Sequence, residues 1–533
     1  MRNTRSNRIV LALASGLLLA CSWPTYGMPL FLFLAFVPLL VAETQLREAQ
    51  RKWTGLHVFG LAYLSFFIWN LSTTYWLWYA DPFGACFAIF VNSILMACVF
   101  RVYHGVAKRS SQIRSFVFLV ALWLSFEKLH LGWEFSWPWL NLGHAFSEHP
   151  QWIQWYEYTG SFGGSLWVWL VNGIVFTGLL KAKASQSRRV LKNTLGIMGT
   201  AILLPIGLSL GIKYQYTMPS ATAEVLILQP NIDPYSEKYN TSNSKISQQL
   251  IGLASPKLTD STAFIIAPET VFAEGLQLPL FSYSGLKTQW DLFLANYPNL
   301  SLIAGISFYD AFTEASRVRS ETNRHPNGFW YDDYNSAILL NGGLDYQRYD
   351  KSKLVVGVEN FPYQDVLKPL IGEVMIDLGG TVAMKTTQNH RAVFRGKDPK
   401  HLAAPIICYE SVYGEFVTGY VRNGASFLAI ITNDAWWDET QGHKQHLSYA
   451  RLRAIETRRG IARSANTGIS AILDPLGEIT THLDYHTEGA LKGKVVLNES
   501  LTFYAIAGDY IARISMFVAL LVFLIAYFRK PRR

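Results

Sequence analysis

Eight apolar segments limit what this chain can fold into more than any other feature of its sequence. A helix needs about 20 apolar residues to cross the roughly 30 Å hydrocarbon core of a bilayer. The segments lie at residues 9–22, 29–41, 56–79, 85–106, 115–126, 165–180, 194–212 and 511–528. The first, second and fifth are short and need tilt or flanking residues. We therefore predict an α-helical membrane bundle of about eight spans.

The composition of the whole chain agrees with a membrane protein that also has a polar part. Of its 533 residues, 50% are hydrophobic and 16% are charged, whereas an ordinary soluble domain carries about 25% charged residues. The mean hydropathy is +0.15. These values exclude a disordered chain, a coiled coil and a small secreted module held by disulfides.

The basic residues indicate which side of the membrane each loop faces. With eight spans, five basic clusters fall on one side, and the short loops 23–27 and 81–84 on the other side contain no Lys or Arg. The positive-inside rule then places both termini in the cytoplasm and the long segment before the last span on the outer side. The clusters are Arg2, Arg5 and Arg8; Arg47, Arg51 and Lys52; Lys108, Arg109 and Arg114; Lys181, Lys183, Arg188, Arg189 and Lys192; and Arg529, Lys530, Arg532 and Arg533.

The net charge of +9 raises the question of nucleic acid binding. A binder of single strands needs aromatic and basic residues interleaved along one surface, and we find no such stretch. The basic residues instead flank apolar segments. We predict no nucleic acid partner.

The polar segment from about residue 221 to 498 reads as an α/β domain. Its short apolar runs are continuous rather than alternating, which is typical of strands covered on both faces. We expect strands at residues 224–229, 263–266, 301–306, 336–340, 404–407, 427–432 and 470–473.

The polar segment contains a single cysteine, Cys408. The other three cysteines lie outside it, so the domain has no internal disulfide. Composition alone leaves a buried structural cysteine and a reactive one equally open. The local sequence favours the second reading, because Cys408 ends an apolar strand and precedes a helix-like segment, where a nucleophile projects over the end of a sheet.

Two further polar residues also follow apolar strands. Glu269 comes after the run at 263–266, and Lys351 comes after the run at 336–340. We expect the three strand ends to converge at one edge of a sheet. There Glu269 would take the thiol proton, Cys408 would attack a carbonyl carbon, and Lys351 would stabilise the oxyanion. Singly, Glu269 and Lys351 are of types usually found on the surface.

The motifs around these residues resemble those of a known superfamily. Pro268-Glu269, Tyr349-Asp350-Lys351 and Cys408-Tyr409-Glu410 are similar to the Glu–Lys–Cys triad of the nitrilase, or carbon–nitrogen hydrolase, superfamily. The membrane bundle and the single C-terminal span narrow the resemblance to the apolipoprotein N-acyltransferase family. Further similar motifs are Ser136–Gly143, Asn433–Trp436, the segment from Gln445-His446 through Ala450-Arg451, Asn466–Gly468, and Thr502–Tyr504 with Gly508-Asp509.

The resemblance implies a three-part chain and a two-step reaction. Residues 1–218 would form the bundle, 219–500 a periplasmic α-β-β-α sandwich, and 501–533 the last span with a basic cytoplasmic tail. Cys408 would take an acyl chain from a phospholipid as a thioester. The N-terminal amine of an apolipoprotein's diacylglyceryl-cysteine would then accept it, at a bacterial inner membrane.

Four more residues receive secondary roles by this reading. Glu359 would position Lys351 or assist proton transfer. Tyr409 and Glu410 would shape the oxyanion side, and Tyr239 would line or gate the acyl entry. Ordinary packing is the alternative for Tyr239, which stands with Lys238 where the family often has Trp. The pair His443 and His446 lacks the accompanying Cys or carboxylate residues of a metal site. We predict no metal and no cofactor.

Two other functions stay open at this point. The first is a membrane-tethered amidase that uses water as acceptor. The second is a transporter or scaffold whose nitrilase-like domain only binds lipid. The presence of all three residues Cys408, Glu269 and Lys351 opposes the scaffold, and the choice of acceptor separates the two enzymes.

Overall fold

The computed structural model describes residues 5–49, 52–371 and 383–528, without the side chains of 370 and 371. It divides into two compact units. One comprises Met1–Trp78, Pro82–Tyr216 and Ala507–Arg533, and the other Tyr79–Asp81 and Thr217–Ile506. Some of the basic residues used above, Arg2, Arg51, Arg529, Lys530, Arg532 and Arg533, lie outside the described residues.

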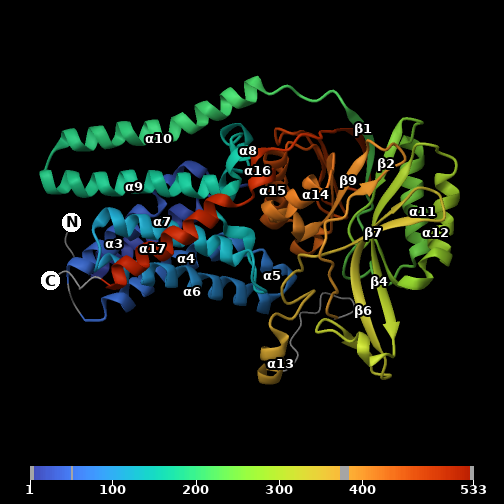
Figure 1. Cartoon of the computed structure of the whole chain (residues 1–533), viewed down its shortest axis with the longest axis horizontal. Coiled ribbons are helices and arrows are strands. Elements are labelled where there is room, and N and C mark those ends of the chain that lie inside the picture. The colour runs from blue at the N-terminus through green and yellow to red at the C-terminus, as the bar shows by residue number, and fades with distance from the viewer. Residues whose placement is uncertain (1–4, 50–51, 372–382, 529–533) are drawn as a thin grey trace. The chain divides into compact units, whose positions relative to one another are not determined.

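The first unit is helical (Figure 1). All eight apolar segments predicted from the sequence are helical in the structure. Among the described residues, six helical stretches are long and apolar enough to cross a membrane, and α1 and α7 are not in that set. The helices of this part of the chain are α1 (Arg5–Ala20), α2 (Leu32–Ala35), α3 (Val37–Glu48), α4 (Thr54–Thr74), α5 (Leu77–Ala80), α6 (Pro82–Ala107), α7 (Gln112–His130), α8 (Tyr156–Thr159), α9 (Ser161–Ser185), α10 (Arg188–Gln215) and α17 (Tyr510–Phe528).

The last helix belongs to this unit although about 290 residues separate it from α10. Small side chains of α17, Ala519 and Ala526, are buried against Phe118 and Ala121 of α7. Small residues let apolar helices approach closely where no hydrophobic effect drives them together. At one end of the pair, Lys128 Nζ lies 2.9 Å from Asp509 Oδ2.

The described part of the second unit contains two β-sheets. One has eight strands, with the order β14-β1-β2-β4-β6-β5, β3 beside β4 and β7 beside β6; the other has the order β13-β12-β11-β10-β9-β8. The strands are β1 (Thr222–Gln229), β2 (Thr262–Ile266), β3 (Phe272–Gln277), β4 (Ser301–Phe312), β5 (Asn323–Arg324), β6 (Trp330–Leu340), β7 (Tyr346–Asp350), β8 (Phe394–Arg395), β9 (Leu402–Ile407), β10 (Phe427–Thr432), β11 (Ile461–Ala465), β12 (Ser470–Leu473), β13 (Ile479–Leu483) and β14 (Gly489–Val496).

The two sheets lie between two layers of helices (Figure 1). Helices α11 (Asn243–Ala254) and α12 (Gly285–Leu294) cover the eight-stranded sheet, where Leu250 and Trp290 pack on Leu226 and Leu302. Helices α14 (Gly414–Arg422) and α15 (Gln441–Thr457) lie over the six-stranded sheet; two shorter helices are α13 (Gln364–Ile371) and α16 (Phe503–Ala507).

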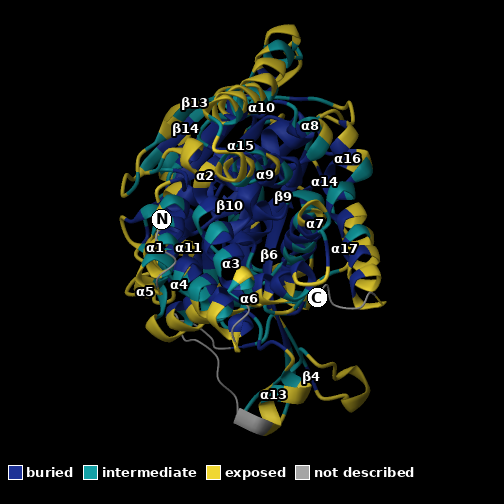
Figure 2. Ribbon diagram, turned by 90° about the vertical axis from the view of Figure 1, so that its left-hand side faces the viewer, coloured by how far each residue is buried: buried dark blue, intermediate teal, exposed yellow. Residues whose placement is uncertain are grey.

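The inner faces of the sheets pack on each other through β1 and β11. Their central strands are buried, as Figure 2 shows for β9 and β10. This confirms the predicted α-β-β-α sandwich. It also explains the continuous apolar runs, because each central strand is covered on one face by helices and on the other by the second sheet.

Candidate active site

The three residues expected to carry the chemistry come from two sheets, not from one. Glu269 follows β2 and Lys351 follows β7, both in the eight-stranded sheet, whereas Cys408 follows β9 in the six-stranded sheet. The prediction of a single sheet edge was therefore wrong. Apolar runs predict buried strands but carry no information on which sheet each strand joins. In addition, the polar strand β7 was not predicted.

Glu269 and Lys351 form a buried ion pair. Lys351 Nζ lies 2.9 Å from Glu269 Oε1 and 3.0 Å from Glu359 Oε1. Asn335 Nδ2 donates to the same two carboxylate oxygens, at 2.8 Å each. The backbone N–H of Asn433 donates to Glu269 Oε2 at 3.2 Å. Glu269 and Glu359 are thus held on either side of one ammonium group.

The turn that carries Glu269 depends on a close approach to β4. Thr270 adopts φ 44°, and the backbone here runs directly over Gly305. A Cβ atom at Gly305 would lie 2.3 Å from Thr270 N and 2.6 Å from Glu269 Cα. Both contacts are to backbone atoms, so only glycine leaves room for this turn.

Cys408 stands at a sharp turn between β9 and a short 3₁₀ helix at Cys408–Val412. Its φ is 49°, in the left-handed region that costs a non-glycine residue of order 1–3 kcal/mol and persists only where the surroundings enforce it. The carbonyl oxygen of Cys408 accepts a hydrogen bond from Ser411 Oγ at 2.7 Å. This is the conformation of a nucleophile elbow.

Burial and the neighbouring charges determine which of the two groups, the Cys408 thiol or the Glu269 carboxyl, holds the proton at rest. Burial raises the pKa of the Cys408 thiol, and the Glu269 carboxylate adds to this while Lys351 opposes it. Burial would also raise the pKa of Glu269, but the Lys351 ammonium and its hydrogen bond outweigh burial and lower it below its usual value. The resting site therefore holds a neutral thiol beside an ionised carboxylate, as a general base requires.

Glu410 ties the loop of Lys351 to the loop of Cys408. This fully buried residue accepts hydrogen bonds at Oε1 from Tyr349 Oη at 2.6 Å and from the N–H of Ser352 at 2.7 Å. At Oε2 it accepts one from the N–H of Ile407 at 2.9 Å. One carboxylate thus fixes the end of β7 and the end of β9, strands of different sheets.

A second buried ionic group lies behind the cysteine turn. His446 Nε2 is 3.2 Å from the carbonyl oxygen of Cys408 and 3.0 Å from Ser411 Oγ, and its Nδ1 is 2.9 Å from Asp434 Oδ1. Arg463 Nη2 lies 2.5 Å from Asp434 Oδ2. The sequence analysis placed Asp434 and His446 in motifs that resemble the family's and weighed His446 as a metal ligand, but it gave Asp434, Arg463 and Asn335 no role in the site.

The remaining two predicted residues lie at the margin of this group. Tyr409 is buried, with its ring centroid 5.2 Å from that of Tyr413. Tyr239 is 39% exposed, and its ring centroid is 5.5 Å from Lys238 Nζ. The sequence reading named Lys238 only as part of a departure from the family pattern.

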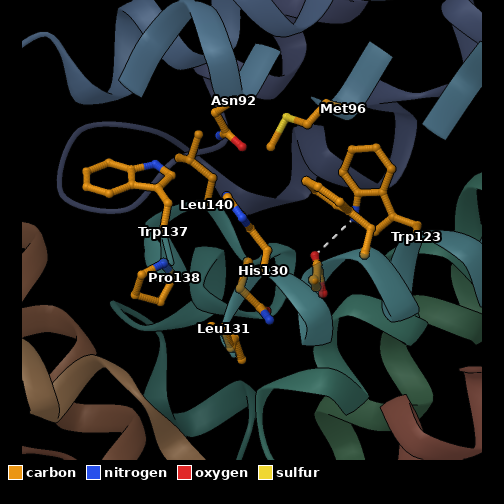
Figure 3. Close-up of a pocket in the computed structure, with 11 residues that line it drawn as sticks. Asn92, Met96, Trp123, His130, Leu131, Trp137, Pro138 and Leu140 are labelled. Carbon is orange, nitrogen blue, oxygen red and sulfur yellow. Dashed lines mark hydrogen bonds between the residues drawn. The ribbon is translucent and has the colours of Figure 1, made fainter. Parts of the chain in front are cut away.

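The helical unit has a pocket of its own, lined by apolar side chains and a few polar ones (Figure 3). Glu127 Oε1 accepts hydrogen bonds there from Trp123 Nε1 at 3.0 Å and from the N–H of Leu142 at 2.9 Å. His130 also lines the pocket, and its Nδ1 accepts a hydrogen bond from Trp133 Nε1 at 2.8 Å. The described residues that line it include no Cys, Ser, Thr or Lys, so the pocket lacks a thiol, hydroxyl or amine nucleophile.

Within the residues that the structure describes, no cluster of three or more His, Cys, Asp or Glu side chains is placed to hold a metal ion.

Two family models match separate parts of the chain. Residues 15–174 match the apolipoprotein N-acyltransferase N-terminal domain, and residues 311–501 match carbon-nitrogen hydrolase. The second range includes Lys351 and Cys408, while Glu269 precedes it.

Relatives of similar length match nearly end to end. A protein named apolipoprotein N-acyltransferase from Chlorobaculum tepidum is 26% identical over 98% of this chain and 97% of its own length. One of the same name from Thermotoga maritima is 24% identical over 98% of this chain and 95% of its own. Among solved structures, a nitrilase-superfamily amidase from Nesterenkonia aligns with 56% of this chain and 99% of its own, at 13% identity and a TM-score of 0.36.

Proposed function

The chain belongs to the apolipoprotein N-acyltransferase family, and on that premise we propose that it moves an acyl chain from a phospholipid to the N-terminal amine of a lipoprotein's diacylglyceryl-cysteine. The observation that carries the proposal is the ion pair of Glu269 and Lys351, 2.9 Å apart, together with the left-handed turn at Cys408. Glu269 and Lys351 both act electrostatically on the Cys408 thiol.

The first half-reaction forms a thioester. Glu269 removes the proton from Cys408, and the thiolate attacks the ester carbonyl carbon of the phospholipid. Lys351 stabilises the negative charge on the carbonyl oxygen. When the tetrahedral adduct collapses, the carbon–oxygen ester bond breaks, and Glu269 returns its proton to the departing lysophospholipid oxygen.

The second half-reaction releases the acyl chain as an amide. The neutral α-amine of the acceptor attacks the thioester carbonyl carbon, and Glu269 takes a proton from the nitrogen. The carbon–sulfur bond breaks and the proton passes to the sulfur of Cys408, which restores the resting site. Both substrates are anchored in lipid, which accounts for the six helical stretches among the described residues that are long and apolar enough to cross a membrane.

We further propose that the protein lies in the bacterial inner membrane with its α/β unit on the periplasmic side. The support is the distribution of Lys and Arg, which are absent from the loops 23–27 and 81–84 and concentrated in the loops on the other side. Lipoprotein acceptors displayed on the outer leaflet would then reach the site by lateral diffusion.

Mass spectrometry of the purified protein tests the reaction. Incubated with labelled phospholipid alone, the protein should hold a hydroxylamine-sensitive acyl group on Cys408, and an added diacylglyceryl-cysteine peptide should remove it as an amide. Cys408→Ala should form neither product, while Cys98→Ala, an exposed cysteine of α6, should form both. Rapid release of free fatty acid without acceptor would instead support the water-using amidase.

A further inference from the structure

Lys238 is a buried lysine whose charge is poorly balanced. Its side chain lies in the loop between β1 and α11 and is 6% exposed. Its Nζ donates a short hydrogen bond to Thr270 Oγ1. Within the described part of the chain no carboxylate lies within ion-pair distance of this ammonium, whereas Lys351 contacts both Glu269 and Glu359.

The ammonium of Lys238 lies against both segments that hold the proposed base. Thr270, its hydrogen-bond partner, is the residue directly after Glu269. On the other side its Nζ is 5.5 Å from the ring centroid of Trp436, which belongs to the short helix Asp434–Trp437. The N–H of Asn433, just before that helix, donates to Glu269.

Burying an ammonium without a counter-charge is costly. The cost of removing a charge from water persists even after relaxation of the protein, and an aromatic ring offsets only part of it. Burial accordingly lowers the pKa of Lys238 to about 8, although Glu269 and Cys408 act in the opposite direction. A cation kept in such a place has its strongest effect when an anion forms beside it.

The proposed reaction forms such an anion twice, first on the sulfur and then on the carbonyl oxygen of each tetrahedral adduct. We propose that Lys238 is a second cation of the active site, which stabilises the negative charge that develops at Cys408 and at the acyl oxygen in both half-reactions. This inference rests on the proposed function. After Glu269 has taken the thiol proton, Lys351 is still balanced by the Glu359 carboxylate, so Lys238 supplies the uncompensated positive charge.

The phosphodiester of a phospholipid donor is a second anion that an ammonium can bind. The position of Lys238 favours the reacting atoms, because it interacts electrostatically with Cys408, Glu269 and Lys351 and is almost fully buried. A donor without phosphate separates the two possibilities.

The experiment compares the single-turnover rate at which Cys408 becomes acylated by a phospholipid and by a neutral p-nitrophenyl ester of a fatty acid. Lys238→Met should slow acylation by about 100-fold with both donors, as the loss of one group that stabilises an oxyanion does. Lys238→Arg, which keeps the charge, should remain within about tenfold of the parent. Lys245→Met, at an exposed position of α11, should react at the parent rate.

Each other outcome has a definite meaning. A loss confined to the phospholipid would assign Lys238 to phosphate recognition and overturn the inference. Equal rates for Lys238→Met and the parent would do the same. Failure of the parent protein to acylate Cys408 with either donor would instead refute the proposed function.

The pH dependence provides a readout that a merely structural role would not move. The acylation rate of the parent should fall as the pH rises through about 8, where Lys238 loses its proton. In Lys238→Arg the rate should hold to higher pH. The same alkaline decline in both proteins would contradict the inference. The titratable groups that face Lys238 are Glu269, Lys351, Cys408 and Lys385.

Discussion

At the scale of single residues, Glu410 shows how the relative position of two loops is set by one side chain. Its two oxygens accept hydrogen bonds from the segments that carry Lys351 and Cys408. From the sequence we predicted that Glu410 helps to shape the oxyanion side of the site. The structure gives it contacts with backbone N–H groups of both loops, and we therefore propose that it acts on the reaction by positioning.

Glu410→Gln should reduce the rate of acyl-enzyme formation by about 10- to 100-fold. The amide places an N–H₂ group among donors and replaces charge-assisted hydrogen bonds with weaker ones. Rapid-quench measurement of the Cys408 thioester reports this rate. Glu439→Gln, at an exposed position, serves as the control, and an unchanged rate in Glu410→Gln would remove its proposed role.

Gly305→Ala should abolish acylation while the protein still folds. The new Cβ atom would meet the backbone at Thr270 N and Glu269 Cα, so the turn that holds Glu269 must move. Gly252→Ala in α11 is the matched control, because nothing lies within 4 Å of its Cβ position and alanine favours a helix by about 1 kcal/mol over glycine. Activity in Gly305→Ala equal to that of Gly252→Ala would contradict this account.

At the scale of secondary structure, apolar strands were predictable and polar ones were not. All seven predicted strands are present, from β1 to β12, because a strand buried on both faces is a continuous apolar run. The strands that were not predicted are β3, β5, β7, β8, β11, β13 and β14. Two of them are strongly polar, since β7 contains Gln347, Arg348 and Asp350, and β11 contains Arg463 and Ser464. Their polar side chains are satisfied by partners distant in sequence, such as Asp434 for Arg463.

The site, too, could be predicted only as far as its residues lie in recognisable sequence patterns. Motifs identified Glu269, Lys351 and Cys408, but their pairing depends on which sheet each strand joins. Asn335 and Lys238 stood outside any expectation, because an amide in β6 and a lysine in a loop become informative only when their neighbours are known.

Arg463→Leu should destabilise the protein by about 3–5 kcal/mol, because it leaves the buried Asp434 carboxylate without its main counter-charge. Although burial alone would raise the pKa of Asp434, Arg463 and His446 hold it below its usual value. The pair therefore stabilises the fold at pH values above the usual Asp pKa, and this contribution is lost as the pH falls through the lower pKa of the folded state.

The measurement is the unfolding transition in detergent at pH 7 and near pH 4, with Arg395→Leu, an exposed position, as the control. The gap between Arg463→Leu and the parent should narrow at the lower pH, where Asp434 of the variant becomes protonated. A gap that stays constant with pH would refute the assignment of the effect to this charge.

At the scale of the whole molecule, the proposed membrane orientation makes a prediction about access. In a background in which Cys21, Cys86 and Cys98 are replaced by alanine, Ser244→Cys should react with a membrane-impermeant maleimide in spheroplasts. Ser185→Cys should react only after the membrane is opened. Both positions are exposed in the structure, so the reverse pattern would overturn the orientation.

Because the site is built from two sheets, the enzyme can lose activity before it unfolds. Cys408 follows a strand of one sheet, whereas Glu269 and Lys351 follow strands of the other. The relative position of these side chains therefore depends on how firmly the two sheets pack on each other. A small displacement of one sheet relative to the other would stop the reaction while every strand stays intact. On warming, we expect turnover to fade at a lower temperature than the circular-dichroism signal of the strands.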